Sequence, residues 1–214
     1  MGLELVLVFD LDGVIRHFDS LELDAQIEAE LGLPAGTLWE LVMESGDLDR
    51  AVVGGFNRRQ WEDRIEAELR AGTRNGADVA ASFQRWRDNV GKADPEMTQL
   101  IEELPEVPVF LFTNGTDRVP EELVRLGIDG LFAGVLNSYN YGLRKPDPAA
   151  YLAAHREIQA VLGLRVPREQ VFFTDDKVKN VQAALDFGWR AEVFQDAARY
   201  RQQLDAVTAD SARN

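Results

Sequence analysis

The sequence contains no cysteine, and basic residues are scarce relative to acidic ones. Without cysteine the chain can form no disulfide, no thiolate metal site and no cysteine nucleophile, which fits a reducing compartment. The 214 residues include 23 Lys and Arg against 37 Asp and Glu, a net charge of −14. Because binding to nucleic acid or to anionic lipid depends on Lys and Arg at the phosphates, we expect neither partner.

A long hydrophobic run is also missing. The first apolar run has no basic residues before it and is interrupted by Glu4 and Asp10, so we expect neither a signal peptide nor a membrane span. A cytoplasmic protein is the expectation. The apolar share of 45% and the charged share of 28% are typical of a folded globular protein with a sizeable core. Monomer and homodimer both remain open.

Four short runs of β-branched and aromatic residues predict strands. They are apolar throughout, which indicates strands buried on both faces. Helical stretches lie between them, and Asp147-Pro148 supplies an N-cap and a first-turn proline for one of these. This alternation predicts an α/β fold, a Rossmann-like parallel sheet with helices on both faces. The predicted strands are residues 5–9, 107–112, 171–173 and 190–194.

The segment 16–92 breaks the alternation. It shows no convincing strand, only amphipathic stretches such as RRQWEDRIEAELRAG, which predict helices. We therefore predict a core of residues 1–15 and 93–214, with a small all-helical cap of residues 16–92 inserted after the first strand. Five aromatic residues are expected to form the core of this cap: Trp39, Phe56, Trp61, Phe83 and Trp86.

Two carboxylates, Asp10 and Asp12, directly follow the first predicted strand. Open α/β sheets bind ligands beyond the carboxyl ends of their strands, so this spacing points two acids into that crevice. The alternative is an ordinary acidic turn in which the Asp side chains cap backbone amides.

Polar residues follow the other strands in the same way. Thr113 and Asn114 end the second run, where a hydroxyl and free amides could hold an oxyanion. Lys145 lies in a segment stiffened by prolines. Asp175 and Asp176 follow the third run, and adjacent carboxylates are costly unless a cation joins them; oxygen ligands of this kind suit Mg²⁺. Taken singly, these features are also compatible with a common turn or a surface lysine.

In their order along the chain, the four motifs DxDG, hhhTN, KPDP and DDxxxN span residues 10–180 and resemble the haloacid dehalogenase-like (HAD) hydrolase superfamily. The helical insert looks like the C1-type cap of its phosphatase-type branch. Within the insert, GGFNRRQWEDRI is similar to a stretch of the small bacterial subfamily that includes sugar-phosphate phosphatases and the amino-terminal domains of some epoxide hydrolases.

The resemblance implies a role for each motif residue. Asp10 would be the nucleophile that forms an aspartyl phosphate, and Asp12 would protonate the leaving oxygen and then activate water. Thr113 and the amide of Asn114 would hold phosphoryl oxygens. Lys145 would pair with both the phosphoryl group and the nucleophile.

The resemblance also implies a magnesium cofactor. Asp176 aligns with the main acidic metal ligand of the family, while Asp175 and Asn180 fit outer or auxiliary positions. Asp10 and the backbone carbonyl of Asp12 would complete the set.

The implied activity is a Mg²⁺-dependent phosphatase acting on a small phosphorylated metabolite such as a sugar phosphate. A phosphomutase and a 2-haloacid dehalogenase of the same superfamily are alternatives. Asp12 favours phosphoryl transfer, since a halide leaving group needs no general acid. A phospho-aspartate signalling domain is a third alternative, but in receiver domains the acidic pair comes first and no helical insert follows.

Three features depart from the motifs or lie outside them. Arg16 stands where a short polar residue is common; Arg16 or His17 could reach a substrate anion, but we expect a solvated loop residue. His155, in the middle of a predicted helix, is expected to be structural. The cap arginines, Arg58 among them, could meet a phosphate, but their spacing selects none of them.

Overall fold

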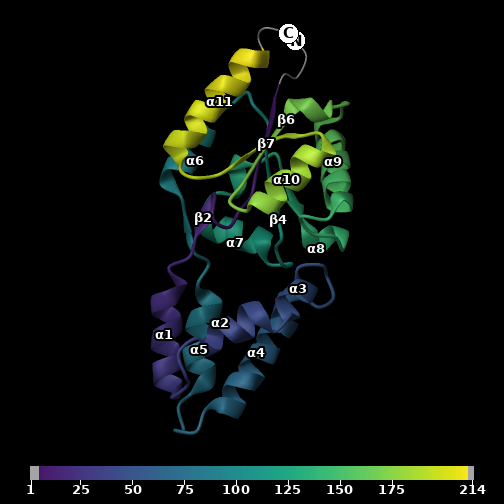
Figure 1. The fold of residues 1–214 in the computed structure, drawn as a ribbon. Coiled ribbons are helices and arrows are strands. Elements are labelled where there is room, and N and C mark those ends of the chain that lie inside the picture. Colours follow the sequence, from purple (N-terminus) through teal and green to yellow (C-terminus); the bar gives the residue numbers. More distant parts are fainter. Residues whose placement is uncertain (1–4, 212–214) are drawn as a thin grey trace.

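The computed structural model describes residues 5–211; the ends of the predicted core, residues 1–4 and 212–214, lie outside the described residues. Its centre is a parallel sheet of five strands in the order β5-β4-β1-β6-β7, which confirms the predicted α/β fold (Figure 1). The strands are β1 Val6–Phe9, β4 Val109–Thr113, β5 Gly134–Asn137, β6 Val171–Asp175 and β7 Arg190–Val193.

Strand β5 is an edge strand that the sequence pattern did not predict. It pairs with β4 in parallel, with Leu136 opposite Phe112. Its sequence is GVLN, and only its last two residues are buried. A four-residue edge strand that begins with glycine lacks the apolar run that marks the buried central strands.

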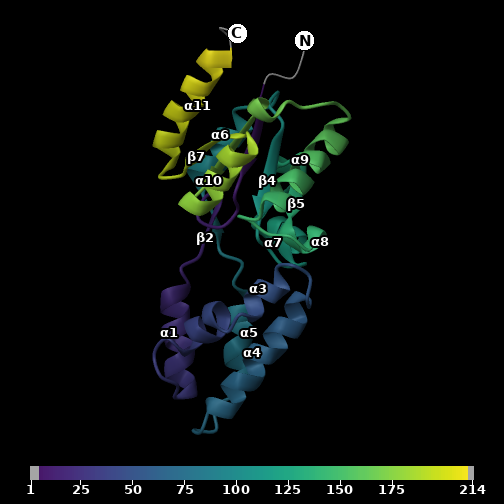
Figure 2. The same cartoon turned by 45° about the vertical axis from the view of Figure 1, so that its right-hand side comes forward.

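Helices cover both faces of the sheet, as predicted (Figure 2). Side chains alternate along β1, so that Leu7 and Phe9 face one layer while Val6 and Val8 face the other. The first layer consists of α6 Pro95–Glu102, α7 Val119–Leu126 and α11 Ala197–Ser211, and the second of α9 Pro148–Leu162 and α10 Val178–Phe187. Three short helices connect these elements: Asp129–Leu131, α8 Ser138–Tyr141 and Arg168–Gln170.

The inserted segment forms a separate helical body at the lower end of the view (Figure 1). It has its own apolar core, in which Trp61 and Phe83 are buried. Trp39 is wrongly predicted as a core residue, because it is 51% exposed where α2 passes into a π-helical turn. The cap elements are α1 Ser20–Leu31, α2 Thr37–Trp39, the π-helical turn Glu40–Glu44, α3 Asp47–Ala51, α4 Arg58–Gly72 and α5 Val79–Asp88.

The two connections between cap and core run side by side. Strand β2, Arg16–His17, pairs in antiparallel fashion with β3, Lys92–Ala93. The expectation of no strand within residues 16–92 is therefore wrong at its ends. Strands of two residues carry no periodicity that a sequence pattern could reveal. Among the described residues, no helix is long and apolar enough to cross a membrane.

Candidate functional site

Three neighbouring strands of the sheet end at one edge, and each delivers a predicted site residue there. Asp10 directly follows β1, Thr113 is the last residue of β4, and Asp175 is the last residue of β6. The Asp10 backbone N–H donates to the carbonyl of Thr174 at 2.8 Å, which extends the ladder by one residue. Because β1 lies between β4 and β6, Asp10 is the central residue of this edge.

Lys145 joins the carboxylates of the two strand ends. Its side chain is 1% exposed, and its Nζ lies 2.9 Å from Asp10 Oδ1 and 2.7 Å from Asp175 Oδ2. Nζ also donates to the carbonyl of Phe112 at 2.6 Å. The Asn114 side chain fixes the backbone of Lys145, accepting from its N–H at 2.8 Å and donating to its carbonyl at 2.9 Å. The predicted pair of Lys145 with Asp10 is present, and Asp175 is a further partner that the sequence did not indicate.

The carboxylate of Asp175 is fully buried but well supported. It accepts hydrogen bonds from the Lys177 backbone N–H at 2.8 Å and from Asn180 Nδ2 at 2.9 Å and 3.0 Å. Burial alone would raise the pKa of Asp175, but the Lys145 ammonium and these hydrogen bonds hold it below its usual range.

Asp10 has the opposite balance. Burial raises its pKa to about 7, and the nearby charge of Asp175 adds to the effect, whereas Lys145 opposes it. A single ammonium therefore does not offset two buried carboxylates. This imbalance is what a bound cation would relieve.

Asp176 completes a group of three carboxylates. One oxygen from each of Asp10, Asp175 and Asp176 lies within 4.8 Å of the others. Asp176 is close to the backbone of Gly13, which has φ 89°; a Cβ at Gly13 would lie 2.9 Å from Asp176 Oδ2. The absence of a side chain at Gly13 thus leaves room for this carboxylate. Carboxylate oxygens so arranged fit a hard divalent cation.

Asp12 does not belong to this group. Its two carboxylate oxygens accept from Arg16, at 2.6 Å from Nε and 3.1 Å from Nη2. Arg16 is 4% exposed, so the expectation of a solvated loop residue is wrong. Its Nη1 donates to Glu122 Oε2 of α7 at 2.7 Å. No local pattern predicts this contact, because Arg16 and Glu122 are 106 residues apart.

The cap arginines differ in where they point. Arg58 lies 2.6 Å from Glu62 and 3.9 Å from Glu122, at the boundary between cap and core. Arg118 of the core also pairs with Glu62, at 3.1 Å. His155 is outside the site: it is buried and its Nδ1 lies 3.1 Å from the indole Nε1 of Trp189, in agreement with a structural role.

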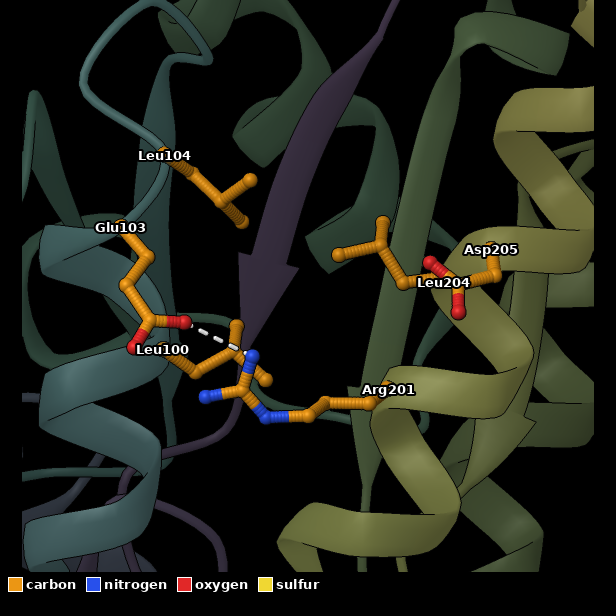
Figure 3. Close-up of a pocket in the computed structure, with 6 residues that line it drawn as sticks. All are labelled: Leu100, Glu103, Leu104, Arg201, Leu204 and Asp205. Carbon is orange, nitrogen blue, oxygen red and sulfur yellow. Dashed lines mark hydrogen bonds and ion pairs between the residues drawn. The ribbon is translucent and has the colours of Figure 1, made fainter.

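A groove with a volume of about 150 Å³ lies between α6 and α11 (Figure 3). The ion pair between Arg201 and Glu103 spans it. None of its lining residues is a predicted site residue. They are Leu100, Glu103, Leu104, Arg201, Leu204 and Asp205.

Known proteins with similar sequence agree with the motif pattern. Residues 5–188 match the family described as haloacid dehalogenase-like hydrolase. The enolase-phosphatase E1 of Erwinia tasmaniensis is 25% identical over 197 residues, which cover 84% of this chain and 74% of that protein.

Solved structures share the fold. A predicted HAD-like hydrolase from Porphyromonas gingivalis has a TM-score of 0.68 at 20% identity, covering 95% of this chain and 98% of that one. A HAD family enzyme from Bacteroides thetaiotaomicron, in complex with magnesium and inorganic phosphate, has a TM-score of 0.69 at 17% identity, covering 91% and 95%. An L-2-haloacid dehalogenase from Xanthobacter autotrophicus, with chloropropionic acid covalently bound, has a TM-score of 0.59 at 18% identity, covering 89% and 76%.

The family match extends from the first strand of the sheet to the end of α10, and so includes all the motif residues and the helical insert. The chain belongs to the haloacid dehalogenase-like hydrolase family.

Proposed function

We propose that this hydrolase is a Mg²⁺-dependent phosphatase that acts on a small phosphorylated metabolite through an aspartyl phosphate on Asp10. One observation carries the proposal: Lys145 bridges Asp10 and Asp175, and Asp176 brings a third carboxylate within 4.8 Å of both. This arrangement combines a nucleophile, a fixed cation and a group of oxygen ligands at one edge of the sheet.

The residues suit a two-step transfer. In the first step an Asp10 oxygen attacks phosphorus, the bond from phosphorus to the ester oxygen breaks, and Asp12 gives a proton to the departing alkoxide. In the second step Asp12 takes a proton from water, the water oxygen bonds to phosphorus, and inorganic phosphate leaves Asp10. Lys145 keeps the nucleophile oriented and offsets negative charge on the phosphoryl oxygens.

The carboxylates of Asp10, Asp175 and Asp176 would hold the Mg²⁺, together with the backbone carbonyl of Asp12. When bound, the metal offsets the charge that the carboxylates and the phosphoryl group place at one point. The net charge of −14 adds to the requirement for local positive charge, since the chain as a whole repels a phosphate dianion. Lys145 alone faces two carboxylates. The Bacteroides enzyme of the same fold, whose structure contains magnesium and phosphate, supports the assignment.

The cap supports a small substrate. Its loop before α4 is held on the core by two hydrogen bonds of 2.6 Å, from Ser138 Oγ to the Val52 carbonyl and from the Arg58 backbone N–H to Asp117 Oδ1. An ion pair between Arg144 and Asp49 adds a third contact. We expect a cap held by these contacts to shield the reaction from water and to limit access for a folded phosphoprotein.

A phosphate-release screen tests the proposal. Purified protein with Mg²⁺ should release phosphate from p-nitrophenyl phosphate and from members of a metabolite panel. Asp10→Asn and chelation of the metal should each abolish release. Asp129→Asn, an equivalent change at an exposed position on a short core helix, should not.

Three outcomes would contradict the proposal. Wild-type turnover by Asp10→Asn would exclude this nucleophile. Halide release from 2-chloropropionate without phosphate release from any ester would indicate a dehalogenase. An isomeric sugar phosphate in place of free phosphate would indicate a mutase.

A further inference from the structure

Asp12, which the proposed function uses to transfer a proton, is paired with Arg16 in this structure. Both of its oxygens accept charge-assisted hydrogen bonds from Arg16, at 2.6 Å and 3.1 Å. These two contacts fix the orientation of the carboxylate and hold it against the guanidinium. For Asp12 to act, this pair must open.

Arg16 is in turn held from behind. Its Nη1 donates to Glu122 at 2.7 Å, and both side chains are almost fully buried, at 5% and 7% exposure. The Asp12 side chain, by contrast, is 45% exposed. The buried pair of Arg16 with Glu122 is therefore the fixed part of the arrangement, and Asp12 is the part that can move.

The same contacts reach the cap. Arg16 belongs to β2, which pairs with β3 where the chain passes between core and cap. The second Glu122 oxygen lies 3.9 Å from Arg58 at the start of the cap helix α4. Arg58 and Arg16 thus share one carboxylate. If Arg58 moves away with the cap, Glu122 loses one of its two cationic neighbours. Its attraction for the Arg16 guanidinium then increases, and the pair of Arg16 with Asp12 weakens.

We propose that Arg16 is a positioning residue that restrains Asp12 in the resting protein and releases it when the cap shifts against the core. The inference rests on the proposed role of Asp12 in phosphoryl transfer. It ties the proton transfer to a substrate that engages the cap, which is a form of selection by induced fit. Substrates that need no proton on the leaving group escape this control.

Leaving-group dependence tests the inference. Acetyl phosphate loses acetate without protonation, whereas an alkyl phosphate needs Asp12, and kcat/KM reports steps up to the transfer to Asp10. In Arg16→Met, kcat/KM for the best alkyl phosphate of the panel should rise relative to that for acetyl phosphate, by roughly two- to fivefold for a half-exposed ion pair. An unchanged or lower ratio would overturn the restraint. Arg201→Met, which removes another 2.7 Å Arg–Glu pair, between α11 and the end of α6, should leave the ratio as in the wild type.

A second measurement keeps Arg16 in place, in case Arg16→Met leaves Glu122 buried without a partner and fails to fold. In ¹⁵N NMR spectra the Arg16 Nε–H signal should shift in Asp12→Asn, which shows the pair in solution. In the wild type, adding Mg²⁺ with orthovanadate should also shift the Arg16 Nε–H signal, because Asp12 is then released from Arg16. An unchanged signal in either experiment overturns the inference. Failure of the proposed function is distinct, since it would show as no phosphate release from any ester while the Asp12→Asn shift persists.

Discussion

Replacing Lys145 by Met should destabilise the protein far more than the loss of an ordinary ion pair. The Lys145 ammonium makes three contacts, to Asp10, Asp175 and the Phe112 carbonyl, all between 2.6 and 2.9 Å. Methionine keeps most of the apolar volume but leaves two buried carboxylates without their cation. Breaking a buried pair in this way costs about 3–5 kcal/mol. At about 2–4 °C per kcal/mol for a chain of this size, the melting temperature should fall by roughly 6–20 °C.

Thermal unfolding in the presence of a chelator measures this loss without help from a bound metal. Lys92→Met is the matched control: Lys92 lies 2.7 Å from Asp19, as close as Lys145 is to Asp175, but both side chains of that pair are 79% exposed. Solvent screens that pair, so its removal should change the melting temperature little.

The pH dependence gives a second check. Lys145 lowers the pKa of Asp10, which burial has raised to about 7, so its removal lets Asp10 take up a proton more readily. The loss in Lys145→Met should therefore be smaller at about pH 6 than at about pH 8. If Lys145→Met unfolds at the temperature of Lys92→Met, the buried bridge does not carry the energy assigned to it.

Three further predictions concern single positions. Gly13→Ala places a Cβ 2.9 Å from Asp176 Oδ2 and should weaken Mg²⁺ binding about tenfold or more in calorimetry, whereas Gly76→Ala, at a similar φ of 75° with no atom within 4 Å, should leave it intact. Burial lowers the pKa of His155 below its ordinary 6.5, so the unfolded chain binds the proton more tightly and stability falls as pH drops below 6.5. His155→Gln should flatten this part of the denaturation midpoint profile; an unchanged slope would exclude His155 as its source. Burial raises the pKa of Asp24 from its ordinary 3.8 to about 6, so the folded protein holds this proton more tightly than the unfolded chain. Stability therefore falls as the pH rises from 3.8 to about 6. Asp24→Asn should raise the melting temperature at about pH 7.5 but not at about pH 4, and equal shifts at both would contradict a charge effect.

The central strands could be predicted because burial on both faces leaves a mark in the sequence. Val6 to Phe9 is apolar at every position and lies between two other strands, so no residue of it faces water. Strand β5 has a neighbour on one side only, and its sequence GVLN carries no such run. The pairing of β2 with β3 has still less local signal, because it joins residues some 75 positions apart through two residues each.

The candidate site divides in the same way. Asp10 and Asp175 could be selected because each stands at the end of a predicted strand, and Lys145 because it belongs to the KPDP motif. Only one of the two ion pairs of Lys145 could be predicted, because no motif pairs Lys145 with Asp175. The prediction of a solvated Arg16 is wrong. A loop position beside an exposed carboxylate looks solvated unless the buried partner, here Glu122 of α7, is known.

Local information in the sequence therefore determined the family, the buried central strands, the helical insert and the identities of the acidic, hydroxyl and lysine groups. Only the tertiary structure shows that Lys145 pairs with Asp175 as well as Asp10, and that Arg16 pairs with Glu122. Strand periodicity and helix caps act between near neighbours, so they are written in short stretches of chain. The ion pairs of Lys145 with the two carboxylates and of Arg16 with Glu122 join segments 30 to 135 residues apart, and their burial depends on how sheet, helices and cap pack together.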